Sequence, residues 1–102
     1  MKPHHLDSEV NSHWLYSIRL AGITKLKRDM LIDALETMAI QCRPFFEPLS
    51  IMPPFVKYKI PNYNYQTNAI SDIGICLPSY PNMKNSDIDI IAENVIYSLD
   101  IL

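Results

Sequence analysis

The sequence predicts a small α/β fold, a two-layer sandwich in which helices pack on one small sheet. Two kinds of apolar spacing predict it: short segments alternate with period two, as strands do, and longer segments repeat at the spacing of helices. The chain has 102 residues, of which 48% are apolar and 20% charged, enough for one hydrophobic core and hardly for two. The expected order is strand, helix, strand, proline-rich loop, weak helix, strand and helix, without an internal repeat.

The first strand is predicted to follow a polar arm. Residues 1–11 are polar and include Pro3, so we expect an arm or linker that leads into a domain spanning residues 12–102. In the segment SHWLYSIRL, residues 12–20, large apolar side chains occupy every second position: Trp14, Tyr16, Ile18 and Leu20. This alternation predicts a strand with one buried face, which Gly22 ends.

The first helix is predicted in the segment KRDMLIDALETMAI, residues 27–40. Its inward face is expected to consist of Met30, Leu31, Ala34, Leu35 and Met38. The short basic cluster KLKRD, residues 25–29, is interpreted as the solvated start of this helix rather than as a binding surface.

A short second strand is predicted in IQCRPFF, residues 40–46. Pro44 offers no backbone donor and pushes Arg43 toward an extended conformation, so this strand belongs at a sheet edge or ends at a site. The following segment, EPLSIMPPF at residues 47–55, contains three prolines that exclude a long helix and hold an irregular loop stiff.

The second half of the chain is predicted to contribute two helices and one strand. Residues 62–72, NYNYQTNAISD, allow a weak helix with Tyr65, Ala69 and Ile70 inward, and GICLPS at 74–79 is a strand stopped by a proline. After a turn in SYPNM, Ser86 and Asp89 resemble a capping box. The last helix then shows a single apolar stripe formed by Ile88, Ile91, Ala92, Val95, Ile96 and Leu99.

Composition excludes several classes of function. The net charge is −2 and the basic residues form no stripe, so we expect no nucleic-acid partner. No apolar run reaches the length of about 20 residues that a membrane span needs, and the N-terminus lacks the apolar segment of a signal peptide, so a cytoplasmic protein without membrane contact is expected. With two glycines and no phosphate-loop, hydrolase-elbow or zinc-protease motif, those enzyme classes are disfavoured.

Thiols, histidines and paired carboxylates receive structural interpretations. Cys42 and Cys76 lack CxxC spacing and are interpreted as free structural thiols. His4, His5 and His13 lie on a polar N-terminal segment, where adjacent histidines cannot easily direct their ring nitrogens at one ion, so no metal site is expected. Asp87 and Asp89 are not interpreted as a catalytic pair, because they lie at a predicted helix N-terminus, where the helix dipole favours carboxylates.

Arg43 is the candidate binding residue, because Phe45 and Phe46 follow it after Pro44. A guanidinium at a strand end offers a planar fork for a phosphate or carboxylate, and the neighbouring aromatic faces suit a nucleotide-bearing ligand. The alternative is an arginine paired with a carboxylate of the chain itself and two phenylalanines in the core. Both interpretations remain open at this level.

Four segments in order resemble the C-terminal small domain of the DegT/DnrJ/StrS group, the pyridoxal-phosphate-dependent sugar-nucleotide aminotransferases. SHWLYSIRL is similar to the strand that enters that domain, RDMLIDAL to its helix, IQCRPFFEPLSIMPPF to its RPFF-P-H-P segment, and GICLPSYPNMKNSDIDIIAENV to its ending. The resemblance is to the perosamine-synthase-like members of this fold-type-I group, which aminate a keto-sugar attached to a nucleotide in the synthesis of deoxyamino sugars and surface polysaccharides.

The resemblance implies partners that this chain does not contain. In that group a large domain binds pyridoxal phosphate, the small domain closes over the site, and the full-length proteins are homodimers that share each site. By position, Arg43, Phe45 and Phe46 would then lie near the nucleotide-sugar substrate, and His13 and Trp14 would line the approach to it. Ser50 stands where the group commonly has a histidine.

Catalysis by this chain alone is not expected. Transamination needs a lysine that forms a Schiff base with the cofactor, and the chain's lysines match no such motif: Lys2, Lys25, Lys27, Lys57, Lys59 and Lys84. No cofactor is therefore expected on the chain by itself, which is interpreted as the product of a truncated gene, a split gene or an expressed fragment. The alternative is a free-standing, non-catalytic module that binds a nucleotide-sugar or a protein partner.

Overall fold

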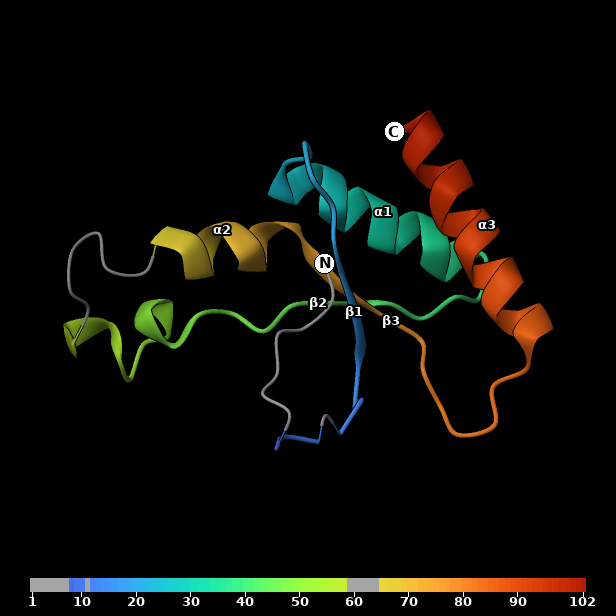
Figure 1. Cartoon of the computed structure of the whole chain (residues 1–102). Helices are drawn as coiled ribbons and strands as arrows, with labels where there is room; N and C mark the ends of the chain where they lie inside the picture. Colours follow the sequence, from blue (N-terminus) through green and yellow to red (C-terminus); the bar gives the residue numbers. More distant parts are fainter. Residues whose placement is uncertain (1–7, 11, 59–64) are drawn as a thin grey trace.

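A three-stranded antiparallel sheet lies at the centre of the fold, in the order β1-β3-β2. The computed structural model of the chain describes residues 8–10, 12–58 and 65–102. Its elements in chain order are β1 Tyr16–Arg19, α1 Lys25–Thr37, β2 Arg43–Pro44, the short 3₁₀ turns η1 Leu49–Ile51 and η2 Val56–Tyr58, α2 Tyr65–Ile73, β3 Gly74–Leu77 and α3 Asn85–Ile101. The predicted order and the two-layer α/β class are confirmed (Figure 1).

The strand register separates the sheet into two faces. On one face, Ile18 of β1 and Pro44 of β2 both pair with Ile75 of β3. On the other face, Ser17 and Arg43 pair with Cys76, because successive side chains of a strand point to opposite sides. β2 is an edge strand, as Pro44 predicts, and β3 ends just before Pro78.

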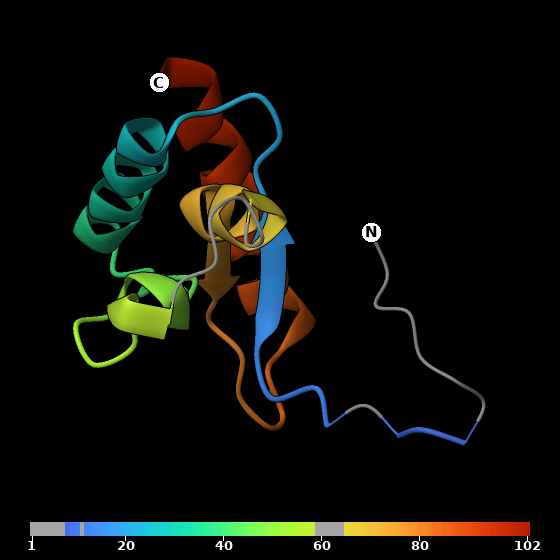
Figure 2. The same ribbon diagram turned by 90° about the vertical axis from the view of Figure 1, so that its left-hand side faces the viewer.

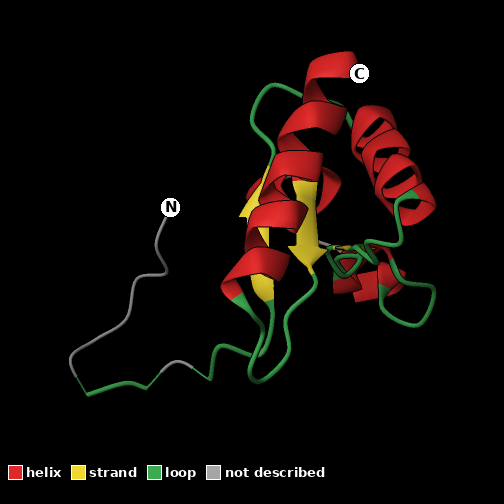
Figure 3. Ribbon diagram, turned by 90° about the vertical axis from the view of Figure 1, so that its right-hand side faces the viewer, coloured by secondary structure: helices red, strands yellow, loops and turns green. Residues whose placement is uncertain are grey.

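The core lies between the first face of the sheet and helices α1 and α3. Leu31 and Leu35 of α1 and Ile75 of β3 are fully buried, and Leu20, Ile40 and Val95 complete the cluster. The two helices lie side by side, with α3 in front of the strands in Figure 3. Burial of leucine and isoleucine side chains stabilises such a core by about 1.5–3 kcal/mol for each.

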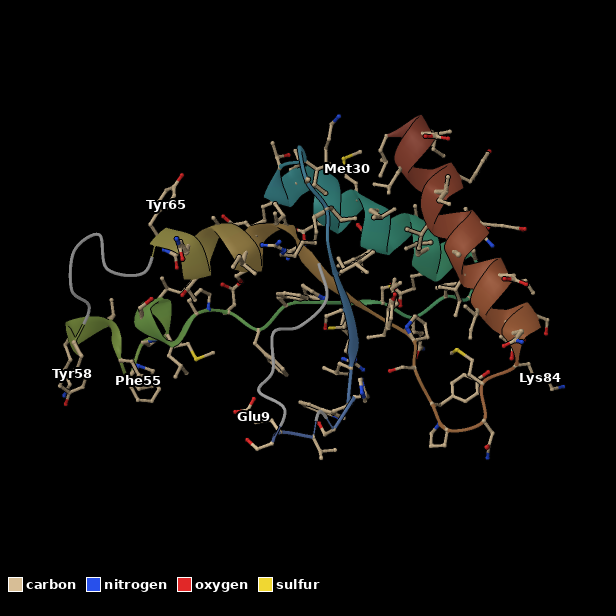
Figure 4. The ribbon with its side chains drawn as sticks, in the orientation of Figure 1. Glu9, Met30, Phe55, Tyr58, Tyr65 and Lys84 are labelled. Atoms are coloured by element: carbon tan, nitrogen blue, oxygen red, sulfur yellow. The ribbon has the colours of Figure 1, made fainter. Side chains whose placement is uncertain are left out.

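The predicted buried faces are wider than the observed ones. In α1, Met30 is 47% exposed and points outward in Figure 4, and Met38 is 37% exposed. In α3, the outward positions of the predicted stripe are Ile88, Ala92 and Ile96. The sheet has only three short strands, so each helix has a narrow surface to cover and the flanks of its stripe stay in contact with solvent.

Helix α1 ends in a Schellman motif that has alanine at the position usually occupied by glycine. Ile40 N donates to Leu35 O and Ala39 N to Glu36 O, both at 3.0 Å, and Ala39 has a φ of 61°. A left-handed conformation costs a residue with a Cβ about 1–2 kcal/mol. Ile40 then enters the core beside Leu35, which joins the helix end to the sheet.

Replacing Ala39 with glycine is expected to stabilise the chain by about 1 kcal/mol, because glycine adopts this φ without steric cost. Urea unfolding measures the change. The matched control is Ala92→Gly in the middle of α3, which is expected to destabilise by about 1 kcal/mol because glycine weakens a helix interior. Changes of the same sign in the free energy of unfolding for the two substitutions would contradict the role assigned to Ala39.

The predicted capping box at the start of the last helix is wrong. The N-cap of α3 is Lys84, without a side-chain cap, so Ser86 lies inside the first turn. The carboxylate Asp87 in that turn instead accepts a hydrogen bond of 2.9 Å from the Tyr80 hydroxyl. This hydrogen bond raises the pKa of Tyr80. The turn before it, with Asn82 at a φ of 63°, brings the tyrosine back to the helix start.

Helix α2 is present, but two of the three residues predicted to face inward, Tyr65 and Ala69, are exposed. Tyr65 is 78% exposed and projects away from the fold in Figure 4, Ala69 is exposed, and Ile70 is half-buried. The buried residue is Ser71, in the last turn. The helix runs into β3 without a loop, so its burial is concentrated at this end; the predicted start of the helix at residues 62–64 lies outside the described residues.

Candidate functional site

An open hollow lies on the second face of the sheet, where α2 meets the strands. Its volume is about 400 Å³. We call it the aromatic hollow. Its lining comes from β1 and the residue before it, the segment after β2, helix α2 and β3: Leu15, Ser17, Phe45, Phe46, Thr67, Ile70, Ser71 and Cys76. Figure 2 looks along α2, with β1 beside it.

Small side chains on the central strands leave room for this hollow. The second face carries small groups: the hydroxyl of Ser17 in β1, and the hydrogen of Gly74 and the thiol of Cys76 in β3. The first face carries isoleucines. The Ser17 hydroxyl lies 3.5 Å from the Cys76 sulfur. The walls are therefore mainly apolar, and a few hydroxyl groups are available to a ligand.

Two aromatic rings form a stacked pair at the hollow, of which Phe46 lines it and Trp14 packs on Phe46. The rings of Trp14 and Phe46 are stacked, with centroids 6.4 Å apart and planes inclined by 23°. Trp14 is 72% exposed and Phe46 75% exposed, so neither belongs to the core. Trp14 was expected on the buried face of the first strand; instead it precedes β1, and a bend at Leu15 separates it from that strand. An exposed aromatic pair of this kind is suited to stacking on a planar or ring-shaped ligand.

Phe45 closes the floor of the hollow by lying directly on a glycine. A Cβ placed on Gly74 would be 2.3 Å from the Phe45 ring, and Phe45 N donates to Gly74 O at 3.1 Å. The ring thus occupies the space that any other residue at position 74 would need. Phe45 is half-buried, while the adjacent Phe46 faces solvent.

Arg28, expected at a solvated helix start, is instead buried with 3% exposure. Its Nη1 donates to the carbonyl oxygens of Ser71 at 2.8 Å and Gly74 at 3.3 Å, and its Nε donates to Asp29 at 2.6 Å. The Ser71 hydroxyl donates to the Phe46 carbonyl at 3.1 Å. A charge cluster of five residues cannot show this in the sequence, because the two carbonyl acceptors lie more than forty positions away.

Arg43 lies apart from the aromatic hollow. It is exposed and lines a second, smaller hollow of about 150 Å³ with Glu36, Gln41 and Cys42. Among the residues that the structure describes, its guanidinium makes no hydrogen bond or ion pair, unlike that of Arg28. The expected grouping of Arg43 with Phe45 and Phe46 is therefore divided between two hollows.

His13 and Ser50, the other candidates, lie outside both hollows. His13 is exposed and has a φ of 49°, next to Trp14 in the segment before β1. Ser50 belongs to the turn η1, and its hydroxyl is buried without a hydrogen-bond partner. Neither residue lines the aromatic hollow, although both flank the segments that carry its rings.

The two thiols are free. Burial, and secondarily the proximity of Cys76, raises the pKa of Cys42, so its thiol stays protonated at neutral pH and is a poor nucleophile. No group of three metal-ligating side chains occurs within the described ranges. No helix in this described part of the chain is long and apolar enough to cross a membrane.

The lysines that the structure describes lie away from both hollows. Lys25 forms an ion pair with Glu47 at 3.2 Å, and the ammonium of Lys57 lies 5.0 Å from the centre of the Tyr58 ring. None of the described lysines lines either hollow.

Solved structures define the class of this fold. A Streptococcus pneumoniae protein described as a sugar aminotransferase, in its PMP form, superposes with a TM-score of 0.73 at 23% identity, over 86% of this chain and 23% of its own. Its PLP form gives 0.71. Helicobacter pylori PseC, an aminotransferase in pseudoaminic acid biosynthesis, superposes with a TM-score of 0.74 at 16% identity, over 86% of this chain and 24% of its own. The fold is that of a portion of these aminotransferases.

The chain belongs to the DegT/DnrJ/EryC1/StrS aminotransferase family, whose sequence profile matches residues 1–96. The GDP-perosamine synthase of Caulobacter vibrioides is 31% identical over 99 residues, which are 97% of this chain and 25% of that protein. The GDP-perosamine synthase of Vibrio cholerae is 33% identical over 78 residues, which are 76% of this chain and 21% of that protein. The chain thus spans about a quarter of the length of these relatives, and the family is PLP-dependent.

The sequence pattern missed most of the lining of the aromatic hollow. Phe45 and Phe46 were expected there, whereas Ser17, Ser71 and Cys76 were not. One signal was available: the small residues of two predicted strands share the face opposite the isoleucines. No comparable signal marks Ser71, since a serine in a weak helix is ordinarily exposed.

Proposed function

We propose that this chain acts as the small domain of a pyridoxal-phosphate-dependent aminotransferase whose substrate is a keto-sugar linked to a nucleotide. The aromatic hollow supports this function most directly: it offers stacked, exposed rings to a ligand while no described lysine reaches it. Such a wall can contact a substrate and close a site that another domain completes. A large PLP-binding domain, on the same or another chain, and a homodimer of the full-length protein are the proposed partners.

The candidate residues have distinct parts in this proposal. Trp14, Phe45 and Phe46 supply apolar surfaces for the sugar or base, and the exposed Arg43 supplies a guanidinium for a phosphate. His13 lies beside Trp14 on the approach, whereas Ser50, whose hydroxyl is buried in η1 outside both hollows, is assigned no contact with the ligand.

A chimeric enzyme tests the proposal. In the GDP-perosamine synthase of Caulobacter vibrioides, the aligned quarter of the chain is exchanged for these 102 residues. We expect the chimera to bind PLP and to form GDP-perosamine, and the isolated chain to do neither. Phe46→Ala in the chimera is expected to lower kcat/KM by about tenfold, corresponding to about 1.4 kcal/mol of lost stacking.

The matched control is Phe55→Ala, since Phe55 is partly exposed near η2, does not line the hollow, and projects away from α2 in Figure 4. Its kcat/KM is expected to stay within about twofold of the parent chimera. A chimera that binds PLP but forms no product would contradict the proposal. Micromolar binding of a GDP-sugar to the isolated chain would support the free-standing binding module instead.

A further inference from the structure

Arg28 has a buried charge that the candidate substrate contacts do not use. Its side chain is 3% exposed, and its one carboxylate partner, Asp29, is half exposed. Burying a guanidinium is unfavourable unless its donors are satisfied, so a buried arginine that persists in a small domain needs a set of acceptors. These acceptors are a carboxylate and two backbone carbonyls of residues far along the chain.

The two carbonyls belong to the junction between α2 and β3. The last carbonyls of a helix have no partner within the helix, and here no loop follows in which they could reach solvent. Leu20 N donates to the carbonyl of Ile73, and Arg28 donates to that of Ser71. α2 has no basic residue in its own last turn, so the cation that complements its C-terminal dipole comes from α1.

The same junction holds both phenylalanines of the aromatic hollow. The carbonyl of Gly74 accepts from Arg28 Nη1 and from Phe45 N, at 3.3 and 3.1 Å. A carbonyl oxygen has two lone pairs, so the two bonds can coexist. Ser71, whose carbonyl accepts from Arg28, donates its hydroxyl to the Phe46 carbonyl at 3.1 Å.

We infer that Arg28 is a positioning residue: by joining the end of α2 to the start of β3, it sets the placement of Phe45 and Phe46, and through Phe46 the stack with Trp14. Arg28 touches no part of the hollow surface itself. Its action on substrate binding rests on the proposed function, whereas its action on the aromatic stack does not. Arginine suits this role because its planar fork supplies donors to several acceptors at once.

Trp14 is the only tryptophan of the chain and reports directly on the stack. In the 102-residue chain, Arg28→Met keeps an apolar stem and removes every donor. We expect it to lose the near-ultraviolet circular dichroism of Trp14 and to raise acrylamide quenching to the level of Phe46→Ala. Arg28→Lys is expected to rescue this signal only in part, because one ammonium cannot reproduce the fork.

Two further variants keep the test decisive. Lys27→Met is the matched control, since Lys27 is the exposed neighbour on α1, and it is expected to leave the Trp14 signal unchanged. Ser71→Ala retains the carbonyl that Arg28 binds and removes the bond to Phe46, so partial loss of the signal is expected even if Arg28→Met does not fold. A wild-type Trp14 signal in folded Arg28→Met, or in Ser71→Ala, overturns the inference.

In the active chimera, Arg28→Met is expected to raise KM by about tenfold and to leave kcat within about twofold, because a displaced aromatic wall weakens binding in ground and transition states alike. A fall in kcat with unchanged KM overturns this consequence. An inactive parent chimera would contradict the proposed function, while the Trp14 measurements would still decide the role of Arg28.

Discussion

Replacing Gly74 with alanine is expected to destabilise the chain by about 2 kcal/mol, within the range of overpacked sites. The reason is steric: the new Cβ would be 2.3 Å from atoms of the Phe45 ring, including Cγ, which cannot move without the backbone or a change of rotamer. The ring must leave its position over β3, so the aromatic hollow loses its floor. In the chimera, we expect kcat/KM to fall together with stability.

A double-mutant cycle isolates this contact. Phe45→Ala removes the ring, so alanine at position 74 is expected to cost less than about 0.5 kcal/mol in that background. Urea unfolding of the four proteins gives the coupling free energy. Additive effects of the two substitutions would show that the ring does not restrict residue 74 to glycine.

Leu35→Ala is expected to lower the free energy of unfolding by about 3 kcal/mol, in the range found for buried leucines. Leu35 is fully buried against the sheet and is also the residue of α1 whose carbonyl accepts from Ile40 N. Leu35 therefore connects the C-terminal end of α1 with the core and with the segment that leads to Arg43. The residual cavity adds to the lost transfer free energy, since a three-stranded sheet has few neighbours that can fill it.

Leu26→Ala in the same helix is the control, because Leu26 is 70% exposed. Its effect is expected within about 0.5 kcal/mol, as for other surface substitutions. The urea concentrations at the midpoints of unfolding measure both changes in stability when the free energy of unfolding falls with urea at the same slope in all variants. Equal losses for Leu35→Ala and Leu26→Ala would contradict the position of the core between α1 and the sheet.

Local patterns predicted the parts of the site that depend on strand and proline chemistry. Pro44 indicates an edge strand, and β2 is at the edge. Phe45 and Phe46 follow that strand and do line the hollow. Arg43 illustrates the limit: strand alternation places it on the same face as Phe45, yet its guanidinium lines the smaller hollow beside the end of α1. Proximity in the sequence therefore does not decide which hollow a side chain enters.

Hydrophobic periodicity also misjudged the width of the buried faces. Ile96 and Met30 lie at helical spacing from buried residues, yet both are largely exposed because no further layer covers them. Periodicity shows which side of a helix is apolar, whereas burial depends on how much of that side another element reaches. The family membership, in which the relatives are about four times longer, supports the proposal that another domain covers part of these surfaces.

By itself, the sequence determined the order of elements, the edge position of β2, the two-layer class and the family resemblance, because strand alternation, helix spacing and proline geometry act over a few residues. Only the tertiary structure decided that Arg28 is buried, that Ser71 holds Phe46, and that Phe45 requires Gly74. The physical reason is that each of these contacts joins segments separated by at least 25 positions, where hydrogen-bond partners and ring contacts are set by packing and leave no local pattern.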